Sequence, residues 1–516
     1  MASASRQKRL TDRITCRQVL NFMVILGFMF NYMLRVNLTI AITDMIKENR
    51  TANATTPSNS TISTAENSTL TVIANETSKL DPQPVDDGQT RFYWNKHEQN
   101  LLLGCFFWGY VLTELPGGRM AEIVGARKIF GGGMLGASVL TLLTPVVAYW
   151  GLIPSVILRS VMGFFLGATW PAIPPMAAKW IPPMERSKFI ANMMASALGA
   201  AITMPVCGYL IDRLGWASTF YVTGAVGLLW SVTWFFVVFD SPADHPRISA
   251  EERLEIETKI AEGSGKGQKP KNVPWIALLT SAPVWAIIIT HGCSVFGYFM
   301  VVNQLPTYMK EVLHFNVKAN GLLSSLPYLG KYVMAVIASY AADRLRRSGR
   351  FSTTAIRKGF TTFAVGVPSL FMIIQAFFGY NATISVTIFT ASLFFNGAVT
   401  AAVTAGYLAN GLDIAPNFSG TIFGMANTLS SFGGYLSTAI VAALTNKNST
   451  FNEWKYLFWI LVGVYGFGGL VYLIFGSGNL QPWNSVERKP SMNGTNGAMI
   501  QEMEPLKKKK DEEAVA

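Results

Sequence analysis

Two short stretches decide how this chain folds: GGRMAEIVGARK, from Gly117 to Lys128, and AADRLRRSGR, from Ala341 to Arg350. In each of them, small residues end an apolar helix, and an acidic residue and then basic residues follow. The stretch at Gly117–Lys128 follows the second apolar segment of the chain, and the stretch at Ala341–Arg350 follows the eighth. One turn at the same place in both halves predicts two related six-helix units. Small residues at such a helix end permit close contact between helices in a membrane.

The composition predicts an all-α membrane protein. Of the 516 residues, 50% are hydrophobic and only 14% are charged, and the mean hydropathy is +0.31. Ordinary soluble domains carry about a quarter charged residues. A helix needs about 20 apolar residues to cross a bilayer. Twelve segments meet this requirement: 19–43, 100–122, 129–149, 152–177, 190–212, 219–239, 276–302, 318–342, 358–379, 382–409, 418–442 and 454–476.

These segments give a twelve-helix chain with two bundles of six helices. The expected parts are a cytoplasmic N-terminus at 1–18, an N-terminal bundle at 19–239 with an outside loop at 44–99, a cytoplasmic linker at 240–275, a C-terminal bundle at 276–478 and a cytoplasmic tail at 479–516. Within the linker, Ser249 and Glu252 have the spacing of a capping box. This spacing predicts one short helix that begins there.

The basic residues predict the orientation of the chain. With the N-terminus placed in the cytoplasm, 29 of the 42 Lys and Arg residues fall in segments assigned to the cytoplasm. Cytoplasmic loops carry an excess of these residues, so both termini are expected to face the cytoplasm. This topology is the same in a plasma, lysosomal or vesicular membrane, and a plasma membrane is the first choice. The net charge of +12 therefore reflects topology. A nucleic-acid partner is not expected, because it needs bases clustered on a water-exposed domain.

The outside loop has the pattern of a glycosylated segment. Five Asn-x-Ser/Thr sequences lie close together in it, and each is an acceptor site for N-linked sugar in a loop that faces outside. The predicted glycosylation sites are Asn49, Asn53, Asn59, Asn67 and Asn75.

Several functional classes find no support in the sequence. The four cysteines, Cys16, Cys105, Cys207 and Cys293, have no CxxC spacing, so neither a disulfide framework nor a metal site is expected. Nucleophile and base residues do not occur at usable spacing, so the chain is not expected to be an enzyme. No cofactor is expected beyond a co-transported sodium ion or proton. The oligomeric state stays open, and a monomer suffices for this architecture.

Longer motifs carry a family resemblance. They are RVNLTIAI (Arg35–Ile42), FFWGYVLTELPGG (Phe106–Gly118), PPMERSKF (Pro182–Phe189), LDIAPNFSGTIFGMAN (Leu412–Asn427) and QPW (Gln481–Trp483). With the repeated turns, they resemble the major facilitator superfamily and its anion:cation symporter branch of sialic acid, vesicular glutamate and sodium–phosphate transporters. Insect inorganic phosphate cotransporter-like members are particularly similar. The resemblance spans about residues 19–483 and implies alternating access. In the repeated turns it implies gating roles for Glu122, Arg127, Asp343 and Arg344.

The residues themselves also indicate anion transport. Only four charged residues sit well inside predicted spans: Arg35, Glu114, Arg159 and Lys331. A charge in the hydrocarbon region costs a few kcal/mol or more, so such residues normally face a cavity on a transport pathway. Three bases and one acid make the cavity positive, which favours an anion.

Depth in the membrane supports a shared site. Arg35 and Arg159 both lie about 10–12 Å beneath the outer surface, at 1.5 Å per residue. They are therefore predicted to converge on one anion, and Ala at either position is predicted to abolish uptake. Tyr110 is a further lining candidate, with packing as the alternative role. Lys331 either contacts the substrate, snorkels or pairs with Glu114.

The coupling residue is left open among three candidates, Glu114, His291 and Asp413. Proton-coupled relatives have a glutamate in the fourth span, where LGATWPA places Leu166 here. Glutamate transporters have an arginine in the seventh span, where Ser294 stands here. The first difference argues against coupling through that glutamate, and the second argues against an amino-acid substrate.

The predicted function is a symporter of a small anion, with inorganic phosphate and sodium as the first choice. A proton-coupled or facilitative transporter of an organic anion and an anion channel are the alternatives. A sensor or receptor that has lost transport is a further reading.

Overall fold

The computed structural model describes residues 15–47, 91–182, 185, 189, 192–263, 273–400, 407–416, 418–446 and 449–484, and among them only an isolated bridge between Ile46 and Phe92 is not helix or loop. The first half forms α1 (Cys16–Met45), α2 (Lys96–Gly104), α3 (Phe106–Val124), α4 (Ala126–Tyr149), α5 (Leu152–Gly167), α6 (Thr169–Trp180), α8 (Ala195–Leu214) and α9 (Trp216–Val237). The linker helix is α10 (Ala250–Gly263). The second half forms α11 (Trp275–Thr280), α12 (Ala282–Glu311), α13 (Val317–Arg347), α14 (Thr353–Phe378), α15 (Ala382–Thr400), α16 (Tyr407–Ile414), α17 (Ser419–Thr445) and α18 (Phe451–Phe475).

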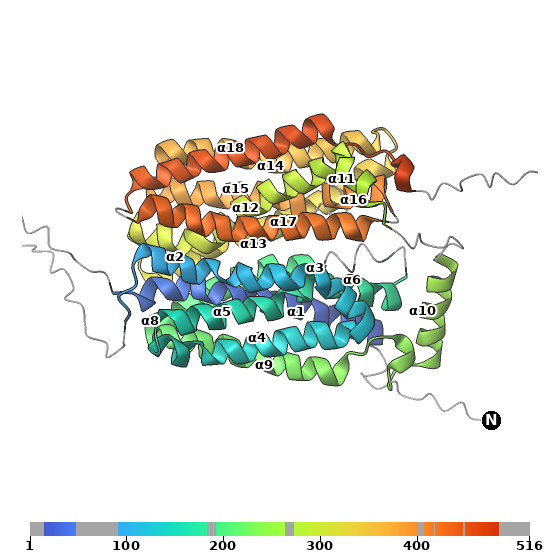
Figure 1. The fold of residues 1–516 in the computed structure, drawn as a ribbon, viewed down its shortest axis with the longest axis horizontal. Coiled ribbons are helices and arrows are strands. Elements are labelled where there is room, and N and C mark those ends of the chain that lie inside the picture. Colours follow the sequence, from blue (N-terminus) through green and yellow to red (C-terminus); the bar gives the residue numbers. More distant parts are fainter. Residues whose placement is uncertain are drawn as a thin grey trace, which may run out of the picture.

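The helices form two bundles that lie one on the other (Figure 1). Helices α1 to α9 pack together as the N-terminal bundle, and α12 to α18 pack together as the C-terminal bundle. Contacts between the bundles run through α8 with α13, α17 with α2 and α3, and α1 with α12. The helix α10 lies across one end of the N-terminal bundle. Two bundles joined by a linker are the architecture that the repeated turns predict.

The predicted spans are present as helices. Ten helices of the described chain are long and apolar enough to cross a membrane, and the bent pair Lys96–Glu114 with Pro116–Val124 makes an eleventh. The shorter apolar helix Ala382–Gly397 lies where the tenth span is predicted. The predicted span 276–302 is wrong at both ends. Helix α11 stops before Ser281, and α12 starts with Pro283 in its first turn and continues to Glu311, because proline fits the first turn of a helix.

The two ends of the bundles differ, and we name them by their residues. The loop end is where α1 ends at Met45 and α2 begins at Lys96; the linker end is where α10 lies. At the loop end, Phe92 donates its backbone N–H to the Met45 carbonyl at 2.7 Å. This bond ties together the two sides of the predicted outside loop. All five predicted glycosylation sites lie outside the described residues.

Helix α1 is the centre of the N-terminal bundle. Every residue from Asn31 to Thr43 is buried. A helix that is buried on all sides packs against neighbours all round. Polar side chains within it therefore need partners inside the protein. Asn31 donates to the Thr169 hydroxyl at 3.0 Å and Asn37 to the Thr223 hydroxyl at 3.0 Å. Both bonds fix the rotation of α1 about its axis.

The first repeated turn joins α3 to α4 through a glycine. Gly125 has φ +107°, and a Cβ there would lie 2.4 Å from a carboxylate oxygen of Asp240. That carboxylate accepts the backbone N–H of Arg127 at 2.8 Å, so it caps α4. The Arg127 guanidinium donates to the Phe235 carbonyl. Arg127 thus ties α4 to the end of α9.

The acidic residue of that turn pairs locally. Glu122 accepts from Arg119 at 2.5 Å, and both side chains are more than half exposed. In the second turn Arg344 is exposed. The side chain of Asp343 lies outside the described residues. The predicted gating roles therefore stay predictions.

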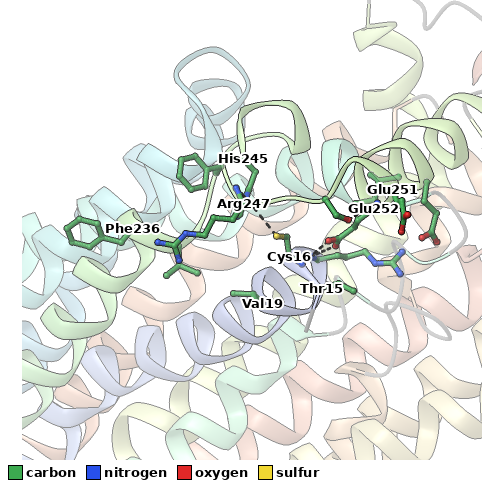
Figure 2. Close-up of a pocket in the computed structure, with 14 residues that line it drawn as sticks. Thr15, Cys16, Val19, Phe236, His245, Arg247, Glu251 and Glu252 are labelled. Carbon is green, nitrogen blue, oxygen red and sulfur yellow. Dashed lines mark hydrogen bonds between the residues drawn. The ribbon is translucent and has the colours of Figure 1, made fainter. Parts of the chain in front are cut away.

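The predicted linker helix is present as α10, but the Glu252 side chain binds another helix and does not complete the capping box. The Ser249 hydroxyl caps α10 by accepting the Glu252 N–H at 3.1 Å. The Glu252 carboxylate reaches another helix: it accepts the backbone N–H groups of Cys16 at 3.1 Å and Arg17 at 3.0 Å (Figure 2). A carboxylate at a helix N-terminus is favourable, because it satisfies free N–H groups and meets the positive end of the helix dipole. Glu252 therefore fastens α10 to α1.

Candidate anion-binding site between the bundles

A cavity of about 140 Å³ lies between the two bundles. The N-terminal bundle contributes Tyr32, Arg35, Tyr110, Glu114, Trp170, Met194, Ser196 and Ala197. The C-terminal bundle contributes His291, Ser294, Val295, Tyr298, Phe299, Lys331, Asn396, Tyr407, Asn427, Ser430 and Ser431. Five of the residues singled out from the sequence meet here: Arg35, Tyr110, Glu114, His291 and Lys331.

Arg35 on α1 sits in a cage of aromatic rings. Its guanidinium carbon lies 4.3 Å from the centroid of the Phe299 ring and 4.9 Å from that of Phe107. The rings of Phe106, Tyr32 and Tyr110 lie within 5.5 Å. Only 5% of Arg35 is exposed, and its Nη2 is buried without an acceptor among the described residues. A buried cationic donor without a partner is costly, so its place in a cavity indicates an anionic ligand.

The second cation of the cavity, Lys331, comes from α13 in the opposite bundle. Its Nζ lies 3.3 Å from the centroid of the Tyr298 ring, and the residue is 8% exposed. The backbone at Lys331 packs tightly on α15, because a Cβ at Gly397 would lie 2.3 Å from the Lys331 carbonyl oxygen. Arg35 and Lys331 therefore present positive charge to one cavity from two bundles.

Glu114 contacts the opposite bundle. Its Oε2 accepts a hydrogen bond from the Ser431 hydroxyl on α17 at 2.5 Å. The pairing of Lys331 with Glu114, which the sequence left open, is not formed among the described residues. Glu114 is 8% exposed and is the single acid among the described residues that line the cavity.

His291 has partners at both ring nitrogens. Nδ1 lies 3.0 Å from the Tyr407 hydroxyl, and Nε2 lies 2.9 Å from Oδ1 of Asn427. Because Oδ1 only accepts, Nε2 carries a proton in this arrangement, and Nδ1 shares a hydrogen bond with the Tyr407 hydroxyl. The two bonds fix the orientation of the His291 ring on the C-terminal side of the cavity.

Two of the predicted residues do not line the cavity in this structure. Asp413 on α16 forms an ion pair with Arg357, with Oδ2 2.7 Å from Nε. Arg159 on α5 donates from Nη2 to the backbone carbonyl of Arg35 at 2.6 Å and from Nη1 to that of Leu34 at 3.4 Å. It thus holds α1 from behind.

The close approach of α5 to α3 brings Arg159 to this position. A Cβ at Gly163 would lie 1.9 Å from the Phe106 carbonyl oxygen, and one at Gly109 would lie 1.9 Å from that of Ser160. The two helices can touch backbone to backbone only because both positions are glycine.

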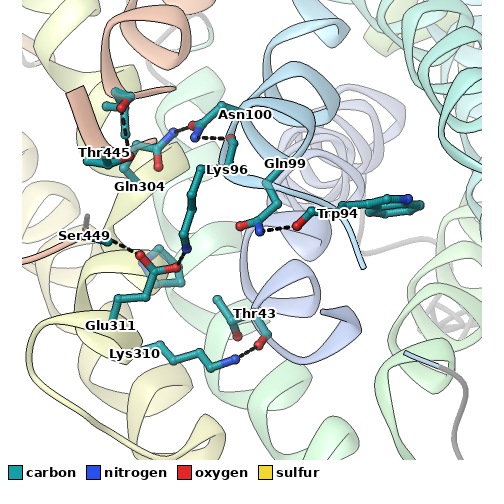
Figure 3. A network of polar contacts seen from close by, with 12 residues as sticks. Thr43, Trp94, Lys96, Gln99, Asn100, Gln304, Lys310, Glu311, Thr445 and Ser449 are labelled. Atoms are coloured by element: carbon teal, nitrogen blue, oxygen red, sulfur yellow. Dashed lines mark hydrogen bonds and ion pairs between the residues drawn. The ribbon is translucent and has the colours of Figure 1, made fainter. Parts of the chain in front are cut away.

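A polar network that sequence reasoning missed joins the bundles at the loop end (Figure 3). Lys96 at the start of α2 forms an ion pair with Glu311 at the end of α12, and the Ser449 hydroxyl donates to the same glutamate at 2.5 Å. Next to it, Gln304 donates to Asn100 at 2.6 Å. The sequence shows Lys96 and Glu311 as charged residues near the ends of apolar helices, but their spacing does not indicate that they pair.

Backbone packing reinforces the same end. Helices α8 and α13 cross where a Cβ at Gly321 would lie 2.6 Å from the Met204 carbonyl oxygen and 3.0 Å from Cα of Gly208. Lys310 also donates to the Thr43 carbonyl across the bundles. These contacts hold the bundles together on the loop side of the cavity.

A larger pocket, of about 820 Å³, lies at the linker end under α10. It is formed by the docking of α10, with Cys16, Arg17, His245, Arg247 and Glu252 on its walls (Figure 2). The Cys16 sulfur lies 3.7 Å from Nδ1 of His245. Burial lowers the pKa of His245 from its ordinary value. Three acidic residues offset the two arginines here, so the pocket offers no counterpart to the cationic cavity between the bundles.

Comparison with known proteins agrees with this architecture. The profile described as Major Facilitator Superfamily matches residues 24–438. Human sialin is 35% identical over 477 residues, which cover 91% of each chain. Human vesicular glutamate transporter 2 is 33% identical over 479 residues, which cover 91% of this chain and 76% of that protein. Among solved structures, the inward-open xylose transporter XylE from E. coli superposes with a TM-score of 0.56 at 15% identity, covering 95% of this chain and 99% of that one.

Proposed function

Because the chain belongs to the major facilitator superfamily, in the branch of sialin and the vesicular glutamate transporters, we propose that it carries a small organic anion across a membrane by alternating access, with Arg35 and Lys331 as the substrate-binding cations. The chain is a multi-pass membrane transporter, and the relationship supports secondary transport of anions. The identity of the anion and of the coupling ion is the part that we propose.

One observation carries the proposal. Arg35 lines the cavity with a buried Nη2 that has no acceptor among the described residues. The anion supplies this acceptor, and Lys331 adds a second positive charge from the other bundle. A ligand held by both bundles can couple its binding to their relative movement, as in transporters whose site lies at the interface of two repeats.

The walls of the cavity favour an organic anion. Six aromatic side chains line it: Tyr32, Tyr110, Trp170, Tyr298, Phe299 and Tyr407. Small-molecule sites are commonly apolar and aromatic with a few placed polar groups. A carboxylate on an apolar or sugar-like body matches two cations beside such walls. Vesicular glutamate transporters are named for an organic anion. Ser294 stands in this chain at the position where the family resemblance implies an arginine in those transporters.

Inorganic phosphate with sodium, the first choice from the sequence, remains the second candidate. Two cations and the hydroxyl and amide groups of Ser294, Asn396 and Ser430 suit phosphate oxygens. The aromatic share of the lining gives phosphate less support than an organic acid.

The loop-end network stabilises a state of the transport cycle in which the loop end is closed. If both termini face the cytoplasm, as the basic residues predict, the loop end faces outside and the network of Lys96 and Glu311 closes that side. In this state the anion reaches the cavity from the cytoplasmic side. The membrane that houses the chain, plasma or vesicular, is tested by imaging a tagged full-length protein in its own cells.

The central experiment is uptake into proteoliposomes that contain the purified full-length chain. Labelled phosphate and a panel of carboxylates that includes glucuronate and benzoate are offered under an imposed sodium gradient and then under an imposed pH gradient. We expect concentrative uptake of a carboxylate. Concentrative phosphate uptake under sodium would select the second candidate, and flux that follows only the anion's own gradient would identify a channel.

Variants test the site within the same assay. Arg35→Ala and Lys331→Ala are expected to lose most uptake, and Arg35→Lys to recover little, because lysine lacks the planar fork that holds a carboxylate at two points. Arg213→Ala is the matched control, since Arg213 is an exposed cation on α8. Wild-type uptake by both Arg35→Ala and Lys331→Ala would contradict the site.

A further inference from the structure

Glu114 is distinguished from the other two coupling candidates by its surroundings. The Asp413 carboxylate is already paired with Arg357. Both ring nitrogens of His291 are engaged, with Tyr407 and Asn427. The Glu114 carboxylate lines the cavity itself and contacts the opposite bundle through Ser431. The charge of Glu114 can therefore respond to a bound anion and change the contact between the two bundles.

The local structure holds this carboxylate in place. The neighbouring Thr113 donates to the Phe164 carbonyl at 2.7 Å, which fixes α3 against α5. Glu114 then projects to α17, where its Oε2 lies 2.5 Å from the Ser431 hydroxyl. The Ser430 hydroxyl donates within its own helix, to the Asn427 carbonyl at 2.8 Å, so it is Ser431 that supplies the cross-bundle donor.

The charged and titratable groups around Glu114 come from both bundles. Among the described lining residues, the basic groups are Arg35 from α1, His291 from α12 and Lys331 from α13, and the tyrosines are Tyr32 from α1, Tyr110 from α3, Tyr298 from α12 and Tyr407 from α16. The lining residues from α6, α8 and α17 are uncharged. Apart from His291, the charged side chains of this lining are two cations, Arg35 and Lys331, and one carboxylate, Glu114.

A bound anion changes the cost of ionising Glu114. Two negative charges in one buried cavity repel each other, so the anion beside Arg35 and Lys331 favours a proton on the nearby carboxylate. Linkage is reciprocal: if the anion promotes proton binding, the proton promotes anion binding by the same factor. Anion and proton therefore bind cooperatively, which favours the doubly loaded state that a symporter carries.

We infer that Glu114 is the proton-binding site that couples anion transport to a proton gradient, and that its hydrogen bond to Ser431 transmits protonation to the bundle interface. The inference rests on the proposed anion transport. A proton from the solvent binds the carboxylate when the anion enters, and returns to solvent on the other side when the anion leaves. No covalent bond other than O–H forms or breaks.

The contact with Ser431 gives protonation a mechanical effect. A hydroxyl that donates to an ionised carboxylate forms a charge-assisted bond, about twice as strong as a neutral one. Protonation of Glu114 removes that charge and weakens the link between α3 and α17. The bundles separate more easily when anion and proton are both bound, and they stay linked when the anion alone is present.

The decisive measurement is proton uptake on anion binding by the purified full-length protein. The protein is titrated in weakly buffered detergent solution containing a pH dye, with glucuronate, benzoate and phosphate as separate probes. The wild type is expected to take up about one proton for each probe anion bound. Glu114→Gln is expected to take up almost none, and the affinity of that variant for the anion should not change with pH.

Two further variants show whether a loss of proton uptake in Glu114→Gln comes from misfolding. Glu114→Asp keeps an acid and is expected to retain proton uptake. Ser431→Ala keeps the acid but removes the donor that stabilises its ionised form, so its pH profile for anion affinity should move to higher pH. Glu257→Gln, an exposed acid on α10 paired with Arg253, is the matched control and should behave as the wild type.

The outcomes separate the two proposals. Undiminished proton uptake by Glu114→Gln, or an unmoved pH profile in Ser431→Ala, would overturn the role of Glu114 while leaving anion transport intact. Failure of the wild type to bind or carry any of the three probes would instead count against the proposed function.

Discussion

The Nη2 of Arg159 donates to the backbone carbonyl of Arg35 at 2.6 Å. The two arginines therefore stand in series, with Arg159 behind α1 and the Arg35 side chain in front of it, facing the cavity. Their equal depth in the membrane, which led us to predict a shared anion, brings them together through the backbone of α1 instead.

The series arrangement predicts different phenotypes for the two arginines. Arg159→Ala should weaken anion binding because α1 loses the donors that hold it at Leu34 and Arg35. Hydrogen bonds to charged groups contribute about 1.5–3 kcal/mol, which corresponds to roughly a tenfold to hundredfold loss of affinity. Anion-binding titrations of the purified variant measure this loss.

Arg159→Lys provides the comparison. A lysine retains the charge and one donor to a carbonyl, so it should restore part of the affinity, whereas Arg35→Lys should not. Equal losses for lysine at both positions would mean that Arg159 touches the anion directly in another state of the cycle.

The ion pair of Lys96 and Glu311 predicts the balance between states. Glu311→Gln should open the loop end more often, because it removes the charge that holds α12 to α2. Ion pairs near a surface contribute up to about 1 kcal/mol, so we expect up to about a fivefold rise in accessibility. Labelling of a cysteine placed at Thr307, which lines a pocket beside Lys96 and Glu311, with a thiol reagent measures it.

A charge swap supplies the control for that experiment. Lys96→Glu combined with Glu311→Lys should return labelling toward the wild-type rate, since the pair is rebuilt in reverse. Faster labelling in the double variant than in Glu311→Gln would show that the pair does not close this end.

The glycines between α3 and α5 predict a stability difference. Gly163→Ala places a Cβ 1.9 Å from the Phe106 carbonyl oxygen, so the helices must separate. Overpacking of this kind costs about 1–3 kcal/mol, and thermal unfolding in detergent should show a lower Tm.

Gly132→Ala is the matched control for the glycine experiment. It lies in α4 with nothing within 4 Å of the added Cβ, and alanine there should be neutral or slightly stabilising because it favours helix. A similar loss of Tm in both variants would mean that helix packing is not the cause.

His245 predicts a pH effect at the linker end. Burial lowers the pKa of His245 in the folded protein, so the unfolded or undocked state binds the proton more readily. The stabilising effect is therefore present at neutral pH and is lost as pH falls below the ordinary histidine value of about 6.5. Limited proteolysis between α9 and α10 should become faster as the pH is lowered from 7.5 to 5.5.

His245→Gln separates this effect from general acid sensitivity. The variant cannot take up a proton at that position, so the difference in cleavage between the two pH values should shrink. An unchanged difference would assign the pH effect to another group.

The sequence predicted the fold well because the fold depends on local signals. Length and hydropathy locate the spans, and the glycine turn around Gly125 marks where α3 ends. The ends of α12 were missed because Pro283 starts the helix late and the helix continues past the apolar segment to Glu311.

The candidate site was predicted in part. Arg35, Lys331 and Glu114, which the sequence singled out as costly charges in apolar spans, line one cavity, and their roles in transport stay predictions. The side on which a charge lies depends on the rotation of its helix, which is set by contacts such as Asn37 with Thr223. The sequence could not show, for that reason, that Arg159 and Asp413 lie away from this cavity. The partners of Lys96 and Glu252 lie too far along the chain for spacing to pair them.

The attachment of Glu252 to the start of α1 also sets the reach of the tether between the bundles. Since α10 is fastened to the N-terminal bundle as far as Gly263, only residues 264–272 separate that bundle from Val273 at the start of the other. The ten steps from Gly263 to Val273 span at most about 36 Å. The chain thus has an upper limit on how far the two bundles can separate at the linker end, and insertions between Gly263 and Val273 would raise that limit without touching the site.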